Sequence, residues 1–387
     1  MSQLLESRWS ETKEALLEGL QGNKRSVMAT TLENTRKYLA ESATSGATSA
    51  GNVATLNRVI LPVIRRVMPT VIANELVGVQ PMTGPVGQIH TLRVRYADTF
   101  NSTSGTDTVA GEEALSPFKI AEGYSGAAND KAASTAALEG VAGNRLSIQI
   151  LKQTVEAKTR KLSARWTFEA AQDAQAQQGI DIEAEIMAAL AQEITAEIDQ
   201  EVLSSLNNLS TTVLTYDQAA VSGTATFVGD EHAALAVQIN RVANLIAQRT
   251  RRGAGNWCVV SPTTLTILQS ATTSAFARTT EGTFEAPTNT KFVGTLNSAM
   301  KVYVNGYATS DDVLIGYKGS SESDAAAFYC PYIPLMSSGV VLDPATFEPV
   351  VSFMTRYGYV ELTNTASSLG NAADYLETIG VSNLSFQ

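Results

Sequence analysis

The sequence holds few side chains that could act as a nucleophile, a general base or a metal ligand at neutral pH. It has two cysteines, Cys258 and Cys330, and two histidines, His90 and His232. Metal centres use these residue types at spacings such as Cys-x-x-Cys and His-Glu-x-x-His, and neither spacing occurs. The serine-hydrolase elbow Gly-x-Ser-x-Gly and the glycine-rich phosphate loops are also missing. We therefore expect no catalytic residue, no cofactor and no metal ion, and predict that the protein is not an enzyme.

The four side chains have simple structural interpretations. His90 falls on the apolar side of an alternating strand, which favours a hydrogen-bonded structural role. His232 follows two acidic residues at the predicted start of a helix, where a solvated turn is the simplest interpretation. Cys258 and Cys330 lie in apolar, strand-like segments and are expected to be inert thiols.

Charge is distributed unevenly along the chain. The formal net charge is −10 and only 17% of residues are charged, which argues against the whole molecule binding nucleic acid or an anionic membrane. Residues 145–165 carry six basic residues and one glutamate, whereas residues 166–240 carry 12 carboxylates and no Lys or Arg. Either both faces are merely solvated, or the basic segment of one copy lies across the acidic helix of a neighbouring copy. The second interpretation pairs Lys158, Arg160, Lys161 and Arg165 with Glu193, Glu197 and Glu201.

Hydrophobic periodicity predicts the elements that carry these charges. Apolar residues recur every four positions along 181–207, which predicts a long helix whose exposed face holds the carboxylates. Alternating residues predict strands at 90–96 and 146–168. Because these strands flank a polar segment at 97–144, we expect a protruding β-ribbon with an irregular tip.

The rest of the chain indicates an α+β body with a separate N-terminal arm. A second helix is predicted at 233–251, and short strands follow it. Residues 1–53 are expected to lie outside any core, as two short helices followed by a small-residue linker at 42–52. No apolar run reaches the roughly 18 residues that a membrane-spanning helix needs, so we predict no membrane segment.

Six segments, in order along the chain, resemble the major capsid proteins of T-even-type tailed bacteriophages. The first two are VIRRVMPTVIANELVGVQPMTGPVGQIHTLRVRYA (63–97) and VEAKTRKLSARWTFEAAQDAQAQQGIDIEAEI (155–186). The others are RRGAGNWCVVSP (251–262), KVYVNGYATSDDVLIGYKG (301–319), AAFYCPYIPL (326–335) and PVVSFMTRYG (349–358). The chain is similar to that family over about residues 54–360.

This resemblance implies the phage Hong Kong 97 capsid fold, in which an extended loop reaches over an adjacent subunit. The implied parts are an N-terminal arm and linker (1–53), the start of a peripheral domain (54–87), the extended loop (88–166), the peripheral domain with a spine helix at 181–207 (167–234), an axial domain (235–325), and a return to the peripheral domain with a C-terminal tail (326–387).

The resemblance also implies a function. Copies of the chain would form hexamers and pentamers of an icosahedral or prolate shell that encloses double-stranded DNA without binding it specifically. The implied partners are the chain itself and portal, scaffold, vertex and decoration proteins. The implied location is the virion, after assembly in the host bacterial cytoplasm. The alternative is an encapsulin-like nanocompartment shell of the same fold, which would lack an arm such as 1–53.

Two properties of the resembled family, an insertion domain and proteolytic trimming, can be compared with this sequence. The polar segment of the ribbon has about 48 residues, too few for the insertion domain of the best-known relatives. Relatives are also trimmed by a prohead protease after a glutamate two residues beyond an aliphatic residue. The triplet at 39–41 fits that pattern and implies cleavage after Glu41, while the triplets at 4–6 and 16–18 are weaker matches.

Overall fold

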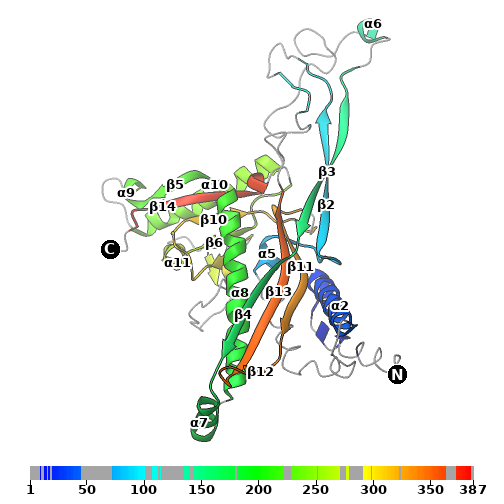
Figure 1. The fold of residues 1–387 in the computed structure, drawn as a ribbon. Helices are drawn as coiled ribbons and strands as arrows, with labels where there is room; N and C mark the ends of the chain where they lie inside the picture. Colours follow the sequence, from blue (N-terminus) through cyan, green and yellow to red (C-terminus); the bar gives the residue numbers. More distant parts are fainter. Residues whose placement is uncertain are drawn as a thin grey trace. The chain divides into compact units, whose positions relative to one another are not determined.

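The computed structural model is an α+β protein, as the sequence predicted (Figure 1). It divides into two compact units: unit 1 comprises Met1–Gly87, Val155–Ser205 and Phe328–Val360, and unit 2 comprises Gln88–Thr154, Leu206–Ala327 and Glu361–Gln387. The structure describes residues 9, 13–14, 16–17, 20–44, 72–100, 107–111, 114, 135–139, 143–178, 181–221, 228–250, 252–270, 276–278, 291–297, 299–321, 324–362 and 372–384.

Unit 1 is built on a five-stranded sheet with the order β1-β11-β13-β12, in which β4 also pairs with β13. Its strands are β1 (Gly78–Val79), β4 (Lys158–Arg165), β11 (Ala327–Ser337), β12 (Val341–Leu342) and β13 (Pro349–Glu361). Successive side chains of a strand point to opposite faces. On β13 the buried face therefore carries Val351, Phe353, Thr355 and Tyr357.

The longest helix of the described chain, α8 (Ile182–Leu209), lies where the sequence predicted a helix at 181–207. Its 28 residues span about 42 Å at 1.5 Å per residue. Asp181 begins the helix, because its carboxylate accepts a hydrogen bond from the backbone N–H of Glu183 at 3.1 Å. The apolar ridge is buried from Leu190 to Leu206. Helix α7 (Phe168–Gln178) precedes α8.

Helix α2 (Gly22–Thr44) of the N-terminal segment packs into unit 1, whereas the sequence predicted that all of residues 1–53 lie outside any core. This helix replaces the second predicted short helix and the start of the linker. Met28 and Leu32, four residues apart on one face, are buried. Asn34 donates to the backbone oxygens of Met82 at 2.7 Å and Tyr332 at 3.0 Å. Local periodicity showed an amphipathic helix but not the surface that receives it.

Short elements connect α2 to the sheet. Helix α5 (Ala73–Leu76) leads directly into β1, which pairs in parallel with β11. Lys24 of α2 forms an ion pair of 2.6 Å with Glu75 of α5.

Unit 2 contains a mixed seven-stranded sheet with the order β5-β14-β10-β6-β9-β8-β7. Its strands are β5 (Thr211–Asp217), β6 (Trp257–Val260), β7 (Phe276–Arg278), β8 (Lys291–Leu296), β9 (Met300–Val304), β10 (Val313–Gly316) and β14 (Leu376–Ser382). Its helices are α9 (Gln218–Val221), α10 (Val228–Thr250), α11 (Pro262–Ser270) and the 3-10 turn η2 (Ala372–Tyr375).

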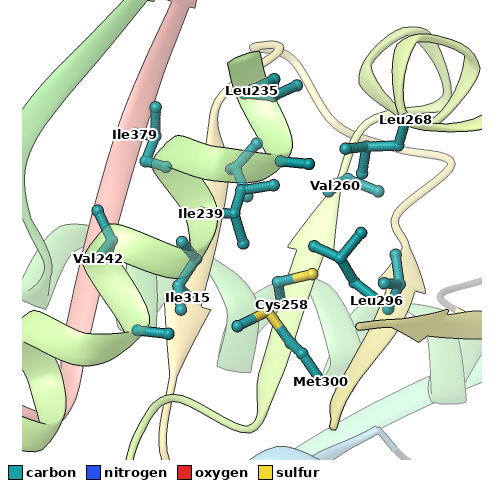
Figure 2. Packing of buried hydrophobic residues seen from close by; sticks show 14 of the residues in the cluster. Leu235, Ile239, Val242, Cys258, Val260, Leu268, Leu296, Met300, Ile315 and Ile379 are labelled. Atoms are coloured by element: carbon teal, nitrogen blue, oxygen red, sulfur yellow. The ribbon is translucent and has the colours of Figure 1, made fainter. Parts of the chain in front are cut away.

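The core of unit 2 lies between α10 and this sheet (Figure 2). Leu235, Ile239 and Val242 follow one another at helical spacing on the buried side of α10. Figure 2 shows them gathered with Cys258 of β6 and Ile315 of β10 in one apolar cluster. The helix predicted at 233–251 is thus confirmed, with a start five residues earlier.

The predicted β-ribbon is present but ends earlier than expected. Strands β2 (Val86–Tyr96) and β3 (Leu146–Glu156) pair with each other. The chain then breaks at Ala157, whose N–H bonds to the oxygen of Pro85 at 2.9 Å, and continues as β4. Since β4 pairs with β13 in unit 1, the basic residues at 158–165 lie outside the ribbon. Within the described part of the 97–144 segment, helix α6 (Thr135–Leu138) is present.

Candidate assembly surfaces

The predicted basic and acidic residues meet in unit 1, around Arg160 of β4. The Nη2 atom of Arg160 lies 2.6 Å from Oε2 of Glu201, and its Nη1 atom forms a second ion pair with Glu197. The two glutamates are four residues apart on α8 and therefore share a face. Antiparallel pairing places Arg160 opposite Thr355, so Tyr357 is its diagonal neighbour on the same face.

Tyr357 completes the cluster. Its phenol donates a hydrogen bond to Oε2 of Glu201, and the guanidinium carbon of Arg160 lies 5.9 Å from the ring centroid. Burial, reinforced by the hydrogen bond to Glu201, raises the pKa of Tyr357, so the phenol remains the donor. These residues brace β4 and β13 against α8.

This geometry corrects the prediction for three of the charged residues. The sequence hypothesis set the basic group that includes Arg160 against the glutamates of a neighbouring copy, whereas in the structure Arg160 pairs with Glu197 and Glu201 of its own chain. Complementary charge suggested that the basic and acidic groups could meet, but periodicity could not show that β4 lies beside α8 of the same molecule. Exposed side chains remain at the other predicted positions, Lys158, Lys161, Arg165 and Glu193, with Arg165 also 3.8 Å from Glu348.

Replacing Arg160 with Met is expected to lower the free energy of unfolding by about 1 to 2 kcal/mol, because two carboxylates and a phenol lose a charged partner. Urea unfolding followed by circular dichroism measures the change. Lys161→Met on the neighbouring, exposed position is the matched control and should cost under about 0.5 kcal/mol. Equal losses in both variants would show that the cluster does not brace the sheet.

The ribbon exposes an apolar stripe on β3. Leu146, Ile148 and Ile150 alternate along the strand, so they share one face, and they are 55%, 69% and 67% exposed. The alternation was visible in the sequence, but only the structure shows that nothing in the described chain covers it. Contiguous exposed aliphatic side chains of this kind mark interaction sites. We call these three residues the β3 stripe.

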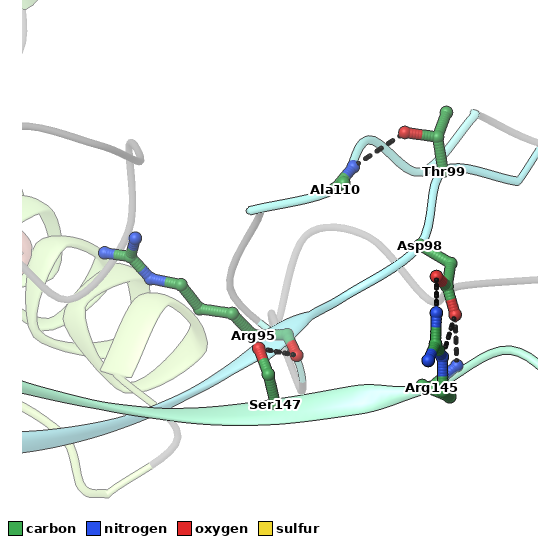
Figure 3. Close-up of polar contacts among 6 residues, drawn as sticks. All are labelled: Arg95, Asp98, Thr99, Ala110, Arg145 and Ser147. Carbon is green, nitrogen blue, oxygen red and sulfur yellow. Dashed lines mark hydrogen bonds and ion pairs between the residues drawn. The ribbon is translucent and has the colours of Figure 1, made fainter.

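The end of the ribbon next to the stripe is held by a network of polar contacts (Figure 3). The Nη2 and Nε atoms of Arg145 lie 3.0 and 3.2 Å from the two carboxylate oxygens of Asp98, a bidentate pair. Hydrogen bonds from Arg145 hold the pKa of Asp98 below its usual value. Tyr96 and Phe100 pack edge to face at 5.6 Å beside these contacts. These contacts fix the described residues at the start and end of the 97–144 segment, while most of the predicted irregular tip lies outside the described residues.

A second exposed apolar surface lies in unit 1 at the turn between β12 and β13. Phe347 is 69% exposed and has a φ of 57°, a left-handed conformation that a bulky residue seldom adopts. Its ring centroid lies 5.8 Å from that of Phe168. Val341 and Leu342 of β12 are also exposed. We call these four residues the β12 patch.

The histidines differ from their predicted environments. His90 is exposed on β2 instead of lying on a buried side. His232 is only 4% exposed, which corrects the solvated turn: its Nδ1 lies 2.5 Å from Oγ of Ser270, and Gln218 contacts its Nε2. No sequence signal linked His232 to Ser270, because 38 residues separate them.

The direction of these hydrogen bonds indicates the tautomer of His232. The amide nitrogen of Gln218 donates to Glu231 at 3.1 Å, which orients that amide so that it also donates to Nε2 of His232. Nδ1 then carries the proton and donates to Ser270, whose hydroxyl donates to the oxygen of Ile267. In this tautomer the His232 ring is held by hydrogen bonds on both nitrogens, from Gln218 and to Ser270, which suits a buried structural histidine.

The cysteines fit the predicted inert thiols. Burial raises the pKa of both Cys258 and Cys330 to about 12, which keeps them protonated at neutral pH. Among the described residues, no group of three or more His, Cys, Asp or Glu side chains is placed to hold a metal ion. None of the described helices combines the length and apolar character needed to cross a bilayer.

Glu41, the predicted cleavage position, lies in helix α2. Protease sites are generally in exposed, extended loops. Cutting after Glu41 therefore requires the end of α2 to unwind, and the cleavage stays a prediction.

Several solved phage structures match the chain over most of its length. The capsid of Myoviridae Phage XM1 covers 80% of this chain and 91% of its own, with 10% identity and a TM-score of 0.43. The capsid structure of the Cyanophage P-SCSP1u covers 80% and 88%, with 11% identity and a TM-score of 0.41.

Sequence relatives are much closer. The major capsid protein of Vibrio phage KVP40 is 30% identical, covering 86% of this chain and 82% of its own. The major capsid protein of Enterobacteria phage T4 is 30% identical, covering 83% and 78%. The family model described as major capsid protein Gp23 matches residues 53–381. Because that match covers most of the sequence, the chain belongs to the Gp23 family of major capsid proteins.

Proposed function

We propose that copies of this chain assemble into the hexamers and pentamers of a tailed-phage head that encloses double-stranded DNA. The observation that carries the proposal is family membership over residues 53–381. The same match favours a phage head over the encapsulin-like alternative. A net charge of −10 suits a shell that binds its enclosed DNA only weakly.

The exposed apolar surfaces supply a physical reason for assembly. The β3 stripe and the β12 patch place seven large apolar side chains in water in the isolated chain. Covering them with other copies removes that cost, at about 1.5 kcal/mol or more for each side chain that becomes fully buried. In a Hong Kong 97-type arrangement, the ribbon formed by β2 and β3 would reach over a neighbouring copy and bury the β3 stripe.

Charge adds specificity to this contact in our proposal. Lys158, Lys161 and Arg165 are exposed, as is Glu193, and they are available for pairing between copies. Opposite fields of this kind steer association and select register more than they add affinity. Portal, scaffold, vertex and decoration proteins are the further proposed partners, with assembly in the host cytoplasm and the virion as the final location.

Assembly is tested by electron microscopy and sedimentation of the purified full chain. We expect the unaltered chain to form capsomers and closed shells. Changing Leu146, Ile148 and Ile150 together to Ser should weaken association about a thousandfold, since three such side chains contribute about 4 to 5 kcal/mol. This variant should remain monomeric at concentrations where the unaltered chain assembles.

The matched control changes the polar residues between them, Ser147→Asn and Gln149→Ser, and should assemble normally. A chain that stays monomeric under all assembly conditions contradicts the proposed function. Normal shells from the triple Ser variant would instead leave the function standing and refute the role of the β3 stripe.

A further inference from the structure

A carboxyl group is buried on α8 without a charged partner among the described residues. Asp199 is only 2% exposed, although its neighbours in sequence two positions away, Glu197 and Glu201, reach Arg160. The Oδ1 atom of Asp199 accepts a hydrogen bond of 2.8 Å from the backbone N–H of Ile72. Buried carboxylates are normally balanced by a cation, so this position is unusual.

Ile72 begins a short segment that links three parts of unit 1. It is the N-cap of α5, and the segment continues through β1 to residue 79. The side chains of Ile72, Leu76 and Val79 are buried. The segment is attached to α8 by Asp199, to α2 by the Lys24–Glu75 ion pair, and to β11 by the pairing of β1.

The groups around Asp199 do not compensate its charge. On β11, Tyr329 is close enough to interact electrostatically with Asp199, and burial raises the pKa of its phenol, so the phenol stays neutral. The guanidinium of Arg160 on β4 is engaged by Glu197 and Glu201, and Lys24 is engaged by Glu75. Tyr357 on β13 donates to Glu201.

We propose that Asp199 is a proton-operated latch: the protonated carboxyl stays buried and holds segment 72–79 on α8, and the ionised carboxylate favours release of the segment into water. The inference concerns the single chain and does not depend on shell assembly. It goes beyond a structural role, because it predicts that the attachment of this segment changes with pH.

The pKa shift of Asp199 determines how the stability of the closed state changes with pH. Burial raises the pKa of Asp199 from 3.8 to about 7 in the closed state, with the Ile72 hydrogen bond acting in the opposite direction. In the open state the carboxyl is hydrated and its pKa is 3.8. The closed state therefore loses stability relative to the open state as pH rises from about 4 to 7, and the loss is complete above pH 7. The opening constant should therefore increase about twentyfold between pH 5.5 and 7.5 and then level off.

Hydrogen exchange of the full chain, analysed by mass spectrometry, tests the latch. Rates for peptides covering 72–79 are measured from pH 5.5 to 8.5 and divided by the intrinsic exchange rates. The unaltered chain should show the twentyfold increase and plateau. Asp199→Asn keeps the acceptor oxygen but carries no charge, so its segment should stay protected with little dependence on pH. Asp181→Asn, which removes an exposed carboxylate from the same helix, should behave as the unaltered chain does.

Two results would overturn the latch. One is an Asp199→Asn variant whose segment opens with the same pH dependence as the unaltered chain. The other is an unaltered chain whose segment 72–79 opens equally across this pH range, measured against the buried part of α10 as an internal reference. The second result decides the question even when the Asn variant does not fold.

Discussion

Replacing Arg249 with Met is expected to lower the free energy of unfolding of unit 2 by about 3 to 5 kcal/mol. Arg249 lies in the last turn of α10 and forms an ion pair with Glu377 of β14, whose side chain has no exposed surface. The Met side chain keeps most of the packing but removes the guanidinium that balances this buried carboxylate. Urea unfolding, followed by the fluorescence of the buried Trp257, reports the change in the same unit.

The double variant separates the charge effect from lost packing. Adding Glu377→Gln to Arg249→Met removes both charges and should recover most of the lost stability, to within about 1 kcal/mol of the unaltered chain. The matched control is Arg145→Met, because Arg145 is 75% exposed and its pair with Asp98 is screened by solvent, so the loss of stability should be much smaller than at Arg249. Equal losses at Arg249 and Arg145 would contradict a buried ion pair in unit 2.

Gly316→Ala should destabilise unit 2 by about 3 kcal/mol through a direct clash. Gly316 lies on β10 between Trp257 of β6 and Leu376 of β14. A Cβ at this position would lie 2.1 Å from Cζ2 of the Trp257 ring, so the strands must separate or the buried ring must move. Thermal unfolding followed by circular dichroism gives the loss, and a shifted Trp257 fluorescence maximum would accompany it.

A glycine in the same sheet provides the control for this substitution. The Cβ of Gly380→Ala on β14 would meet its nearest atom at 3.5 Å, an ordinary contact, so the cost should be under about 1 kcal/mol. Combining Gly316→Ala with Trp257→Val makes room for the new methyl group and should be less destabilising than the sum of the two single changes. Purely additive losses would show that the ring and the glycine are not in conflict.

Elements with strong local periodicity were predictable from the sequence. The apolar ridge of α8 and the buried face of α10 follow the helical period, and both helices appear within a few residues of the predicted bounds. Strand β6, at 257–260, is one of the short strands that the sequence predicted after the helix at 233–251. In each case the spacing of the apolar residues along the sequence indicates which side of the element is buried.

Features that depend on a distant partner were not predictable. The sequence predicted one extended segment at 146–168, where the structure has two strands, β3 and β4, separated at Ala157. Strand β3 pairs with β2, whereas β4 pairs with β13, and these partners lie far away in the sequence. The docking of α2 through Asn34 and the burial of His232 likewise depend on residues far away in the chain.

For the candidate assembly residues, too, the sequence indicated the side chains but not their surroundings. Charge complementarity grouped four basic residues with three glutamates, but the sequence alone did not show that Arg160 would contact Glu197 and Glu201 within one chain. The β3 stripe was visible as alternate aliphatic residues. Only the absence of a covering element in the described structure shows that the stripe is exposed.

The position of β14 has a consequence for synthesis on the ribosome. This strand, at Leu376–Ser382, lies between β5 and β10, and in the described sheet β5 pairs with no other strand. A nascent chain that has already emerged through residue 360 still lacks the strand that joins β5 to the rest. Unit 2 therefore completes its sheet only after residues 376–382 have left the ribosome, which delays the appearance of a subunit ready to join a growing lattice.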